Sequence, residues 1–253
     1  MLLLRSYLFL PVWIATGIIT GTVSLLLWPL PYRWGYNIIM LWNRFVVWWA
    51  GFCCGVHYRV VGKRPFTAEP CVILSNHQST WETVFLQYYF GPASTILKKE
   101  LLRIPFFGWG LALLRPVAID RSNPVQALKR VKSLGKARLK DGNNLLVFPE
   151  GTRMAPGQSG RYARSGADIA CSAGVPVVPV AHNAGTCWPG RSLLKYPGTI
   201  TVIIGEPIAT QGRTSREVME EARTWIEDQV AAIGRSPKHA AQCTAQSGPP
   251  GKL

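Results

Sequence analysis

The chain has 253 residues, which is enough for one substantial domain with attachments and excludes two large independent domains. Its 28 lysine and arginine residues outnumber 13 aspartate and glutamate residues, giving a formal net charge of +15 that attracts nucleic acid, an anionic membrane or a phosphorylated substrate. The 6 cysteines show neither a CxxC pair nor framework spacing, and the 4 histidines are scattered without an HExxH motif. The composition therefore predicts reduced, cytoplasmic thiols and no bound metal.

The first 55 residues are predicted to form a helix pair that is embedded in a membrane or re-enters it. No charged residue lies between Arg5 and Arg33, and this stretch is apolar, contains glycine and is bordered by aromatic residues. A second apolar stretch, residues 34–56, is rich in tryptophan and is interrupted only by Arg44. Because nearly all other cations follow the pair, we expect both of its ends in the cytoplasm, and hence an inner-membrane protein with its catalytic part on the cytoplasmic face. Spanning the bilayer and dipping into one leaflet both fit this pattern, and two buried helices of a soluble protein are the alternative.

After this pair, short β-rich runs alternate with longer helical or loop stretches, which is the rhythm of an α/β domain. We expect one domain over residues 56–233, built on a single mixed, largely parallel sheet that is flanked by helices. The predicted strands cover residues 56–62, 71–75, 94–97, 116–119, 145–148, 175–180 and 199–205.

Two long helices are predicted in the second half of this domain. Residues 122–140 have a proline at an early helical position and apolar residues at helical spacing, and their other face is strongly basic. That face is either simply solvated or in contact with anionic lipid headgroups. Residues 214–233 begin with a capping box of Thr214 and Glu217 and carry an apolar stripe. Residues 234–253 lack apolar periodicity and are expected to be a disordered tail.

Polar segments follow two of the predicted strands, where an open α/β sheet usually binds its ligands. One is "SNHQSTWE" (75–82), and the other is "PEGTR" (149–153). Ser79 and Glu82 form a capping box, so a helix should start near Ser79 with His77 still in the loop. From there the His77 ring can fold back to the Glu82 carboxylate, which would stabilise the protonated ring and leave its other nitrogen as a general base. The alternative is that Glu82 is only a cap and His77 only a loop residue.

Four ordered blocks resemble those of a known family. They are His77-x4-Glu82, "AIDR" (118–121), "FPEGTR" (148–153) and "VPVVPV" (175–180). Together they resemble the glycerolipid acyltransferases, most closely the 1-acyl-sn-glycerol-3-phosphate acyltransferases, over roughly Val56 to Pro207. The sequence departs from the commonest family pattern at Glu82, where an aspartate is usual.

The resemblance implies transfer of a fatty acyl group from a thioester to the sn-2 hydroxyl of lysophosphatidic acid, which forms phosphatidic acid. An alcohol is a poor nucleophile until its proton is removed, so His77 as base with Glu82 behind it suits this reaction. The donor would be acyl-CoA or acyl carrier protein, and no cofactor is expected. A covalent intermediate is not required, since a thiolate leaves readily and the chain has no G-x-S-x-G elbow.

The acceptor's phosphate needs cations, and the resemblance points to Arg121 and Arg153 as phosphate or glycerol contacts. Lys98 is a third candidate by its position after a predicted strand. Glu150 is expected to bond a glycerol hydroxyl or to pair with Arg153, and the neighbouring Gly151 and Thr152 complete this binding block.

The apolar segment 100–114 is predicted either to form the acyl-chain channel or membrane-facing lip, or to pack in the core. Expected partners are anionic membrane lipids, lysophosphatidic acid and the acyl donor. Nucleic acid is not expected, because no recognition motif is present and the aromatic residues gather in the N-terminal region. Two alternatives stay open: an acyltransferase for glycerol-3-phosphate or a lyso-ornithine-type lipid, and a non-catalytic lysolipid-binding membrane protein.

Overall fold

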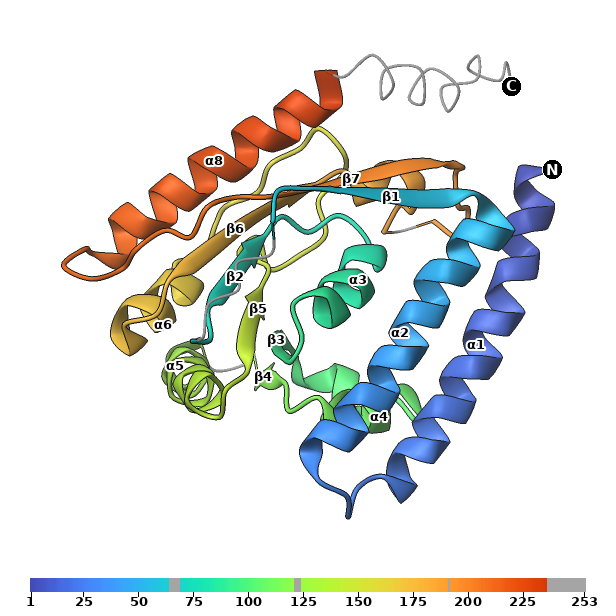
Figure 1. Cartoon of the computed structure of the whole chain (residues 1–253), viewed down its shortest axis with the longest axis horizontal. Coiled ribbons are helices and arrows are strands. Elements are labelled where there is room, and N and C mark those ends of the chain that lie inside the picture. The colour runs from blue at the N-terminus through green and yellow to red at the C-terminus, as the bar shows by residue number, and fades with distance from the viewer. Residues whose placement is uncertain (64–68, 121–123, 191, 236–253) are drawn as a thin grey trace.

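The computed structural model describes residues 1–63, 69–120, 124–190 and 192–235. Seven strands form a single mixed sheet in the order β1-β7-β6-β2-β5-β3-β4 (Figure 1). Within this sheet, β6 and β7 are antiparallel and the other neighbouring pairs are parallel. The strands are β1 (Val56–Val61), β2 (Val72–Ser75), β3 (Ala93–Lys98), β4 (Val117–Ile119), β5 (Asn144–Val147), β6 (Val177–His182) and β7 (Gly198–Ile204).

All seven predicted strands are present, and the predicted single, largely parallel sheet is confirmed. The largest difference in bounds concerns β6, which begins and ends two residues later than its apolar pattern indicates. The strand continues past the apolar run because Ala181 and His182 pair with Ile203 and Val202 of β7. This extension carries a histidine to the carboxyl end of the strand.

Helices cover both faces of the sheet, as Figure 1 shows. Alternating side chains divide between two cores: Ile73 of β2 packs in the cluster formed with α2 and α3, whereas Val72 and Leu74 pack with α5, α6 and α8. Both clusters are built mainly from fully buried aliphatic and aromatic side chains, which stabilise the three layers. The helices are α1 (Leu2–Leu26), α2 (Tyr32–Cys54), α3 (Trp81–Tyr89), the 3-10 helix η1 (Lys99–Arg103), α4 (Phe107–Leu113), α5 (Pro124–Lys140), α6 (Ser165–Ala173), α7 (Ala184–Cys187) and α8 (Ser215–Arg235).

The two long helices predicted from the second half of the sequence are α5 and α8. Thr214 and Glu217 form the expected capping box, since the Thr214 N–H donates to the Glu217 carboxylate at 2.8 Å and the Glu217 N–H donates to the Thr214 hydroxyl at 3.3 Å. The last helix runs to Arg235, so the first two residues assigned to the tail are helical. Residues 236–253, the rest of that tail, lie outside the described part of the chain.

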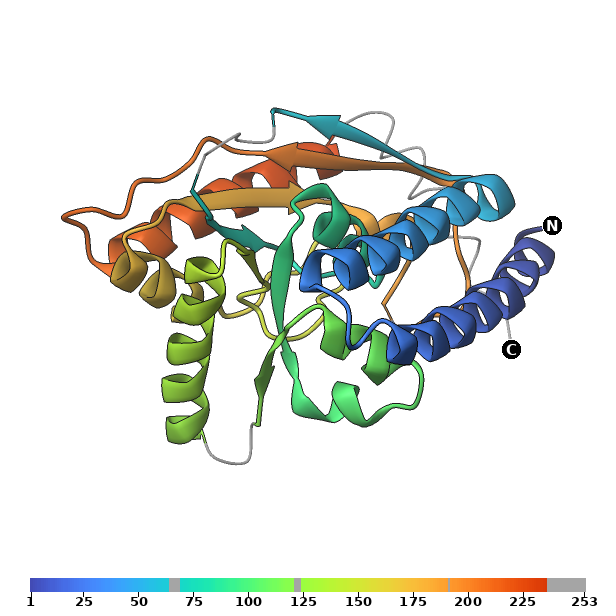
Figure 2. The same cartoon turned by 60° about the horizontal axis from the view of Figure 1, so that its bottom comes forward.

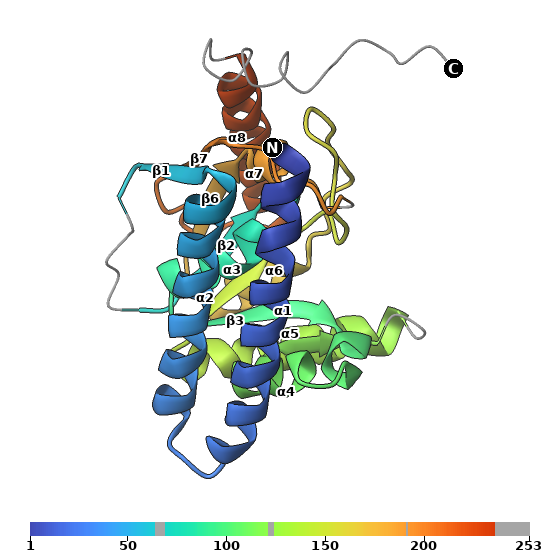
Figure 3. The same ribbon diagram turned by 90° about the vertical axis from the view of Figure 1, so that its right-hand side faces the viewer.

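The N-terminal helix pair consists of α1 and α2, which lie side by side (Figure 3). The first helix begins at Leu2 and continues through Pro11, which lies inside it. Among the described residues, α1 is the one helix that is long and apolar enough to cross a membrane. Many large apolar side chains of the pair are exposed, among them Leu4, Ile19, Trp28, Leu41 and Phe52.

The first helix also packs against α4, which belongs to the predicted apolar segment 100–114 (Figure 2). Gly21 makes this close approach possible, because a Cβ atom at that position would collide with the backbone carbonyl of Phe106. Gly17, one turn earlier in the same helix, has more room: its nearest neighbour would be Trp42 at 3.4 Å. The sequence therefore places a glycine where α1 meets the backbone of the α/β domain.

We expect Gly21→Ala to lower the stability of the folded chain by about 1–3 kcal/mol, because the new methyl group must push α1 away from Phe106. Gly17→Ala is the matched control in the same helix and should be neutral or slightly stabilising, since alanine favours the helix. Thermal unfolding of both variants in detergent measures the difference. Equal melting temperatures would show that the contact at Gly21 is not a tight one.

Candidate active site

The carboxyl ends of four parallel strands meet at one edge of the sheet. The segments that follow them are 76–80 after β2, 148–153 after β5, Lys98 at the end of β3 and His182 at the end of β6. Because these strands run in the same direction, segments far apart in sequence lie next to one another at this edge. Most of the predicted site residues therefore share one region.

The expected contact between His77 and Glu82 is present. The Nδ1 atom of His77 lies 2.8 Å from Oε1 of Glu82, which also accepts the backbone N–H groups of Gln78 at 2.9 Å and Ser79 at 2.7 Å. The helix begins at Trp81, later than the predicted start, because the Ser79 hydroxyl accepts the Trp81 N–H. His77 thus stays in the loop, as the reach of its ring requires. The Glu82 side chain therefore reaches the His77 ring, and its length does not prevent the contact.

Glu82 is fully buried, and its charge is decided by its partners. Burial raises the pKa of the Glu82 carboxyl. The nearby His182, the His77 ring and the Ser79 N–H lower this pKa by more than burial raises it, so it lies below its usual value. An ionised carboxylate accepts a proton-bearing Nδ1 and leaves the lone pair on Nε2 of His77. The ring of His77 is also stacked on Phe148, with centroids 4.4 Å apart, which fixes its plane.

Asn76 and His182 form a clamp directly behind His77, and the sequence argument missed both residues. The Asn76 amide donates to the His182 carbonyl at 2.9 Å, and the His182 N–H donates to the Asn76 amide oxygen at 3.0 Å. In addition, Nε2 of His182 lies 2.8 Å from the Asn76 carbonyl, while its Nδ1 accepts the Ala184 N–H at 3.2 Å. One tautomer, with its proton on Nε2, satisfies both contacts; burial lowers the pKa of His182, whereas the charge of Glu82 acts in the opposite direction.

The sequence indicates where the two residues of this clamp lie, although it does not indicate their pairing. Asn76 lies inside the same block as His77, and His182 follows the "VPVVPV" run whose strand neighbours β2 in the sheet. Neither residue belongs to a type and spacing that indicates chemistry by itself. Their pairing becomes visible only when β2 and β6 are placed side by side.

The Glu150 carboxylate binds the backbone N–H of His77. Its Oε2 atom accepts the His77 N–H at 2.7 Å, and no ion pair with Arg153 is found among the residues described. Burial raises the pKa of Glu150 to about 7, and the negative charges of Glu82 and Glu227 act in the same direction, whereas the hydrogen bond from His77 lowers it. The expected partners of Glu150 were a glycerol hydroxyl or Arg153. The structure instead shows that its carboxylate holds the backbone of the loop that carries His77.

The three cations predicted to bind the phosphate have different surroundings in the structure. Arg153 is half-buried, donates to the Gly190 carbonyl at 3.4 Å, and has a buried Nε atom without a partner in the described chain. A Cβ atom on Gly190 would lie 2.7 Å from the Arg153 side chain, so this glycine makes room for the guanidinium. Lys98 is exposed at the end of β3. Arg121 lies outside the described residues.

A cavity of about 810 Å³ runs between the helix pair and the sheet edge. His77, Lys98, Thr152 and Arg153 supply polar groups to its wall, and Gly151 also borders it. The predicted apolar segment 100–114 lines it as well, so this segment is more than core packing. Its apolar wall comes mainly from α1, α2 and α4, including Trp13, Ile14, Ile18, Ile39, Trp42, Phe106, Phe107 and Leu111.

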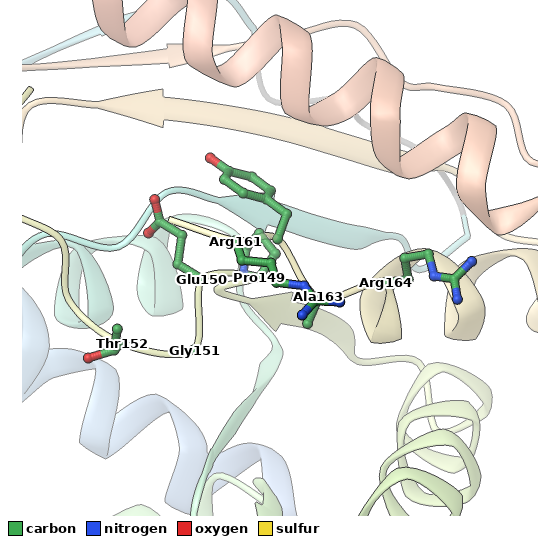
Figure 4. Close-up of a pocket in the computed structure, with 8 residues that line it drawn as sticks. Pro149, Glu150, Gly151, Thr152, Arg161, Ala163 and Arg164 are labelled. Atoms are coloured by element: carbon green, nitrogen blue, oxygen red, sulfur yellow. The ribbon is translucent and has the colours of Figure 1, made fainter. Parts of the chain in front are cut away.

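A second, smaller pocket of about 410 Å³ lies against the same loop (Figure 4). It shares Pro149, Gly151, Thr152 and Ala163 with the large cavity. Gly151 has a φ of 66°, and its N–H closes a turn onto the Phe148 carbonyl at 3.0 Å, so glycine suits this position. The loop that carries Glu150 therefore borders both voids.

Comparison with known proteins agrees with the geometry of this edge. A family model described as "Acyltransferase" matches residues 57–183, which is half of the chain. The chain belongs to this acyltransferase family. The match begins in β1 and ends just after β6, so it includes His77, Glu82, Glu150, Arg153 and His182.

Individual relatives of this acyltransferase are also known. A protein of Pseudomonas aeruginosa named 1-acyl-sn-glycerol-3-phosphate acyltransferase is 46% identical and aligns over 91% of each chain. A protein of the same name from Saccharomyces cerevisiae is 31% identical over 72% of this chain and 63% of its own length. The crystal structure of the 1-acyl-sn-glycerophosphate acyltransferase of Thermotoga maritima has the same fold, with a TM-score of 0.77 and 23% identity over 93% of this chain and 97% of that one.

The raised pKa of Glu150 predicts a pH-dependent stability difference between the wild-type protein and Glu150→Gln. In the unfolded chain this carboxyl ionises near pH 4.5, and in the folded protein it ionises near pH 7. The wild type therefore loses stability relative to the variant as pH rises from about 4.5 to 7, by at most about 3 kcal/mol. Glutamine can still accept the His77 N–H. Melting temperatures from pH 4 to 8 test this: a gap that stays constant over that range contradicts it.

Proposed function

We propose that this acyltransferase moves a fatty acyl group from a thioester to the sn-2 hydroxyl of 1-acyl-sn-glycerol-3-phosphate and so forms phosphatidic acid for phospholipid synthesis. The observation that carries this function is that His77, paired with the buried Glu82, lies on the wall of an apolar cavity whose polar groups include Arg153 and Lys98. The names of the relatives at 46% and 31% identity support the same acceptor. A hydroxyl, a phosphate and a fatty chain are thus matched by a base, cations and an apolar wall.

The reaction follows from the state of His77. With Nδ1 bonded to the Glu82 carboxylate, Nε2 accepts the proton of the acceptor hydroxyl while its oxygen attacks the thioester carbonyl. A carbon–oxygen bond forms, the carbon–sulfur bond breaks, and the departing thiolate takes up the proton from the imidazolium. Glu82 stabilises that imidazolium through its charge, which a buried carboxylate does strongly.

The phosphate of the acceptor must lie close to His77, because the phosphate ester oxygen and the reacting sn-2 oxygen are on adjacent carbons of glycerol. Arg153, which borders the cavity and has an unpartnered Nε, and Lys98 are the described cations in this position. A guanidinium binds phosphate oxygens with two parallel hydrogen bonds. By the family resemblance, Arg121 joins them, and Thr152, on the wall of the large cavity, borders the glycerol.

The apolar wall of the cavity, including the α4 segment, receives fatty acyl chains. Burial of each methylene group contributes about 0.8 kcal/mol, so a long chain adds substantial binding energy. The donor is acyl-CoA or an acyl carrier protein thioester, and both carry the acyl group on a phosphopantetheine arm. No further cofactor enters this reaction scheme.

Membrane association fits the exposed apolar surface of α1 and α2. Since α1 packs along α4 and lines the cavity, the helix pair places the cavity next to the lipid from which the acceptor comes. We assign the protein to the inner membrane with its catalytic domain on the cytoplasmic face, where acyl thioesters are available. Anionic lipids attract its net positive charge.

Replacing His77 by alanine should lower acyl transfer by at least about 100-fold, the usual effect of losing a general base. His57→Ala is the matched control, because His57 is exposed on β1 and lines neither cavity. The measurement is thiol release from an acyl thioester on addition of lysophosphatidate, with glycerol-3-phosphate and a lyso-ornithine lipid as competing acceptors. Near-normal activity of the His77 variant would remove this residue from the mechanism.

His182 should act as a positioning residue through Asn76. His182→Phe leaves the Asn76 carbonyl without its ring donor, and we expect roughly tenfold lower kcat with little change in the KM for lysophosphatidate. Glutamine can place an N–H near the former Nε2, so His182→Gln should recover part of the kcat. If both variants lose activity in proportion to their loss of folded protein, the clamp has only a structural role.

A further inference from the structure

The smaller pocket has a chemical character that the acyl acceptor does not explain. Arg161 and Arg164 line it, and both side chains are exposed. Neither guanidinium has an ion pair or a hydrogen bond to any other residue in the described part of the chain. Two unpaired guanidinium groups at one pocket are an anion-binding arrangement, since each offers a planar set of donors.

Position separates these two arginines from the catalytic cations. Arg153 and Lys98 line the large cavity together with His77, whereas Arg161 and Arg164 line only the smaller pocket. Figure 4 shows the pocket residues spread from Thr152 at one end to Arg164 at the other. Pro149, Thr152 and Ala163 border both voids, whereas Arg161 and Arg164 belong to the wall of the smaller pocket alone among the described residues.

Because Arg161 and Arg164 line a different void from His77, their position decides which substrate's phosphate they can bind. In the acceptor, phosphate and reacting hydroxyl are on neighbouring carbons, so a phosphate near Arg164 would draw the hydroxyl away from His77. In the acyl donor, a long pantetheine arm separates the reacting thioester from its phosphate. A donor whose carbonyl lies beside His77 can therefore extend its arm past Thr152 into the smaller pocket.

We propose that the pocket between residues 149–152 and 161–164 binds the pantetheine arm of the acyl donor and that Arg161 and Arg164 bind its phosphate. This inference rests on the proposed acyl transfer and assigns a site to its second substrate. The phosphate is the diphosphate of coenzyme A or the phosphodiester of an acyl carrier protein, and the recognition chemistry is the same for both. After transfer, the free thiol leaves by this route while phosphatidic acid remains on the membrane side.

Among the residues that the structure describes, Glu150 is the one carboxyl group that lines this pocket, and it does not oppose the assignment. Its Oε2 atom is bonded to the His77 N–H, and in Figure 4 the side chain turns away from Arg164. Burial raises the pKa of Glu150 to about 7, which reduces its negative charge near neutral pH. The cationic end of the pocket is thus separated from its acidic end.

The test compares wild-type protein with the double variant Arg161→Gln/Arg164→Gln and a charge-matched control, Arg59→Gln/Arg216→Gln. The control removes two exposed arginines on β1 and α8 that line neither void. Three donors with the same acyl chain are used: acyl-CoA, acyl carrier protein thioester and acyl-pantetheine, which has no phosphate. The KM for each donor and the KM for lysophosphatidate are measured in detergent.

We expect the double variant to raise the KM for phosphate-bearing donors by roughly tenfold or more, the effect of losing charge-assisted hydrogen bonds. The KM for acyl-pantetheine and for lysophosphatidate should match those of the wild type and the control. An increase confined to acyl-CoA or to the carrier protein identifies which source of phosphate the pocket serves.

Three outcomes would overturn the proposal: an unchanged KM for both phosphate-bearing donors, an equal loss with acyl-pantetheine, or a higher KM for lysophosphatidate. A higher KM for lysophosphatidate would assign these arginines to the acceptor site. Each result is distinct from failure of the proposed function, because that failure appears as absent thiol release in the wild-type protein with every donor.

Discussion

A single buried carboxylate organises the catalytic loop of this acyltransferase. Oε1 of Glu82 accepts three donors at once: the His77 ring and the N–H groups of Gln78 and Ser79. The same oxygen therefore fixes the path of the loop that leads into α3 and selects the tautomer of the base. In a fully buried position the carboxylate stays charged only because these donors compensate for the loss of water. Removal of the charge would alter fold and chemistry together.

The rest of the site holds this loop from two sides. Asn76 is tied to the end of β6 by its hydrogen bonds with His182, and the His77 N–H is held by Glu150 from the loop after β5. Because β2 lies between β6 and β5 in the sheet, each neighbour supports the loop at its own edge. The parallel arrangement of these strands thus provides both the proximity and the rigidity that a positioned base needs.

The two voids bordered by the 149–152 loop differ in the chemistry of their walls. The large cavity is formed with the N-terminal helix pair, so its fatty chains remain on the side of the exposed apolar surface. The smaller pocket has arginines in its wall and, among the described residues, none from the helix pair. A reaction that joins a lipid acceptor to a water-soluble donor requires such a division, with the base at the boundary.

The sequence alone determined the sheet, the helix pair and the chemical blocks. Alternating and continuous apolar runs predicted all seven strands, and the capping boxes at Ser79 and Thr214 located two helix starts to within two residues. The spacing of His77 and Glu82 was enough to predict their contact, because a loop followed by a helical turn restricts where the two side chains can meet. These features are local, and the short-range geometry of the backbone decides them.

Only the tertiary structure decided the Asn76–His182 clamp, the bond from His77 to Glu150, the glycine contact of α1 with α4 and the second pocket. Each joins segments separated by many residues, and their pairing depends on the order of the strands in the sheet and on how closely backbones approach. No periodicity in one segment encodes the position of a distant one. The physical reason is that residue type and spacing define what a side chain can do, whereas packing of the sheet and its helices defines which other side chain it can reach.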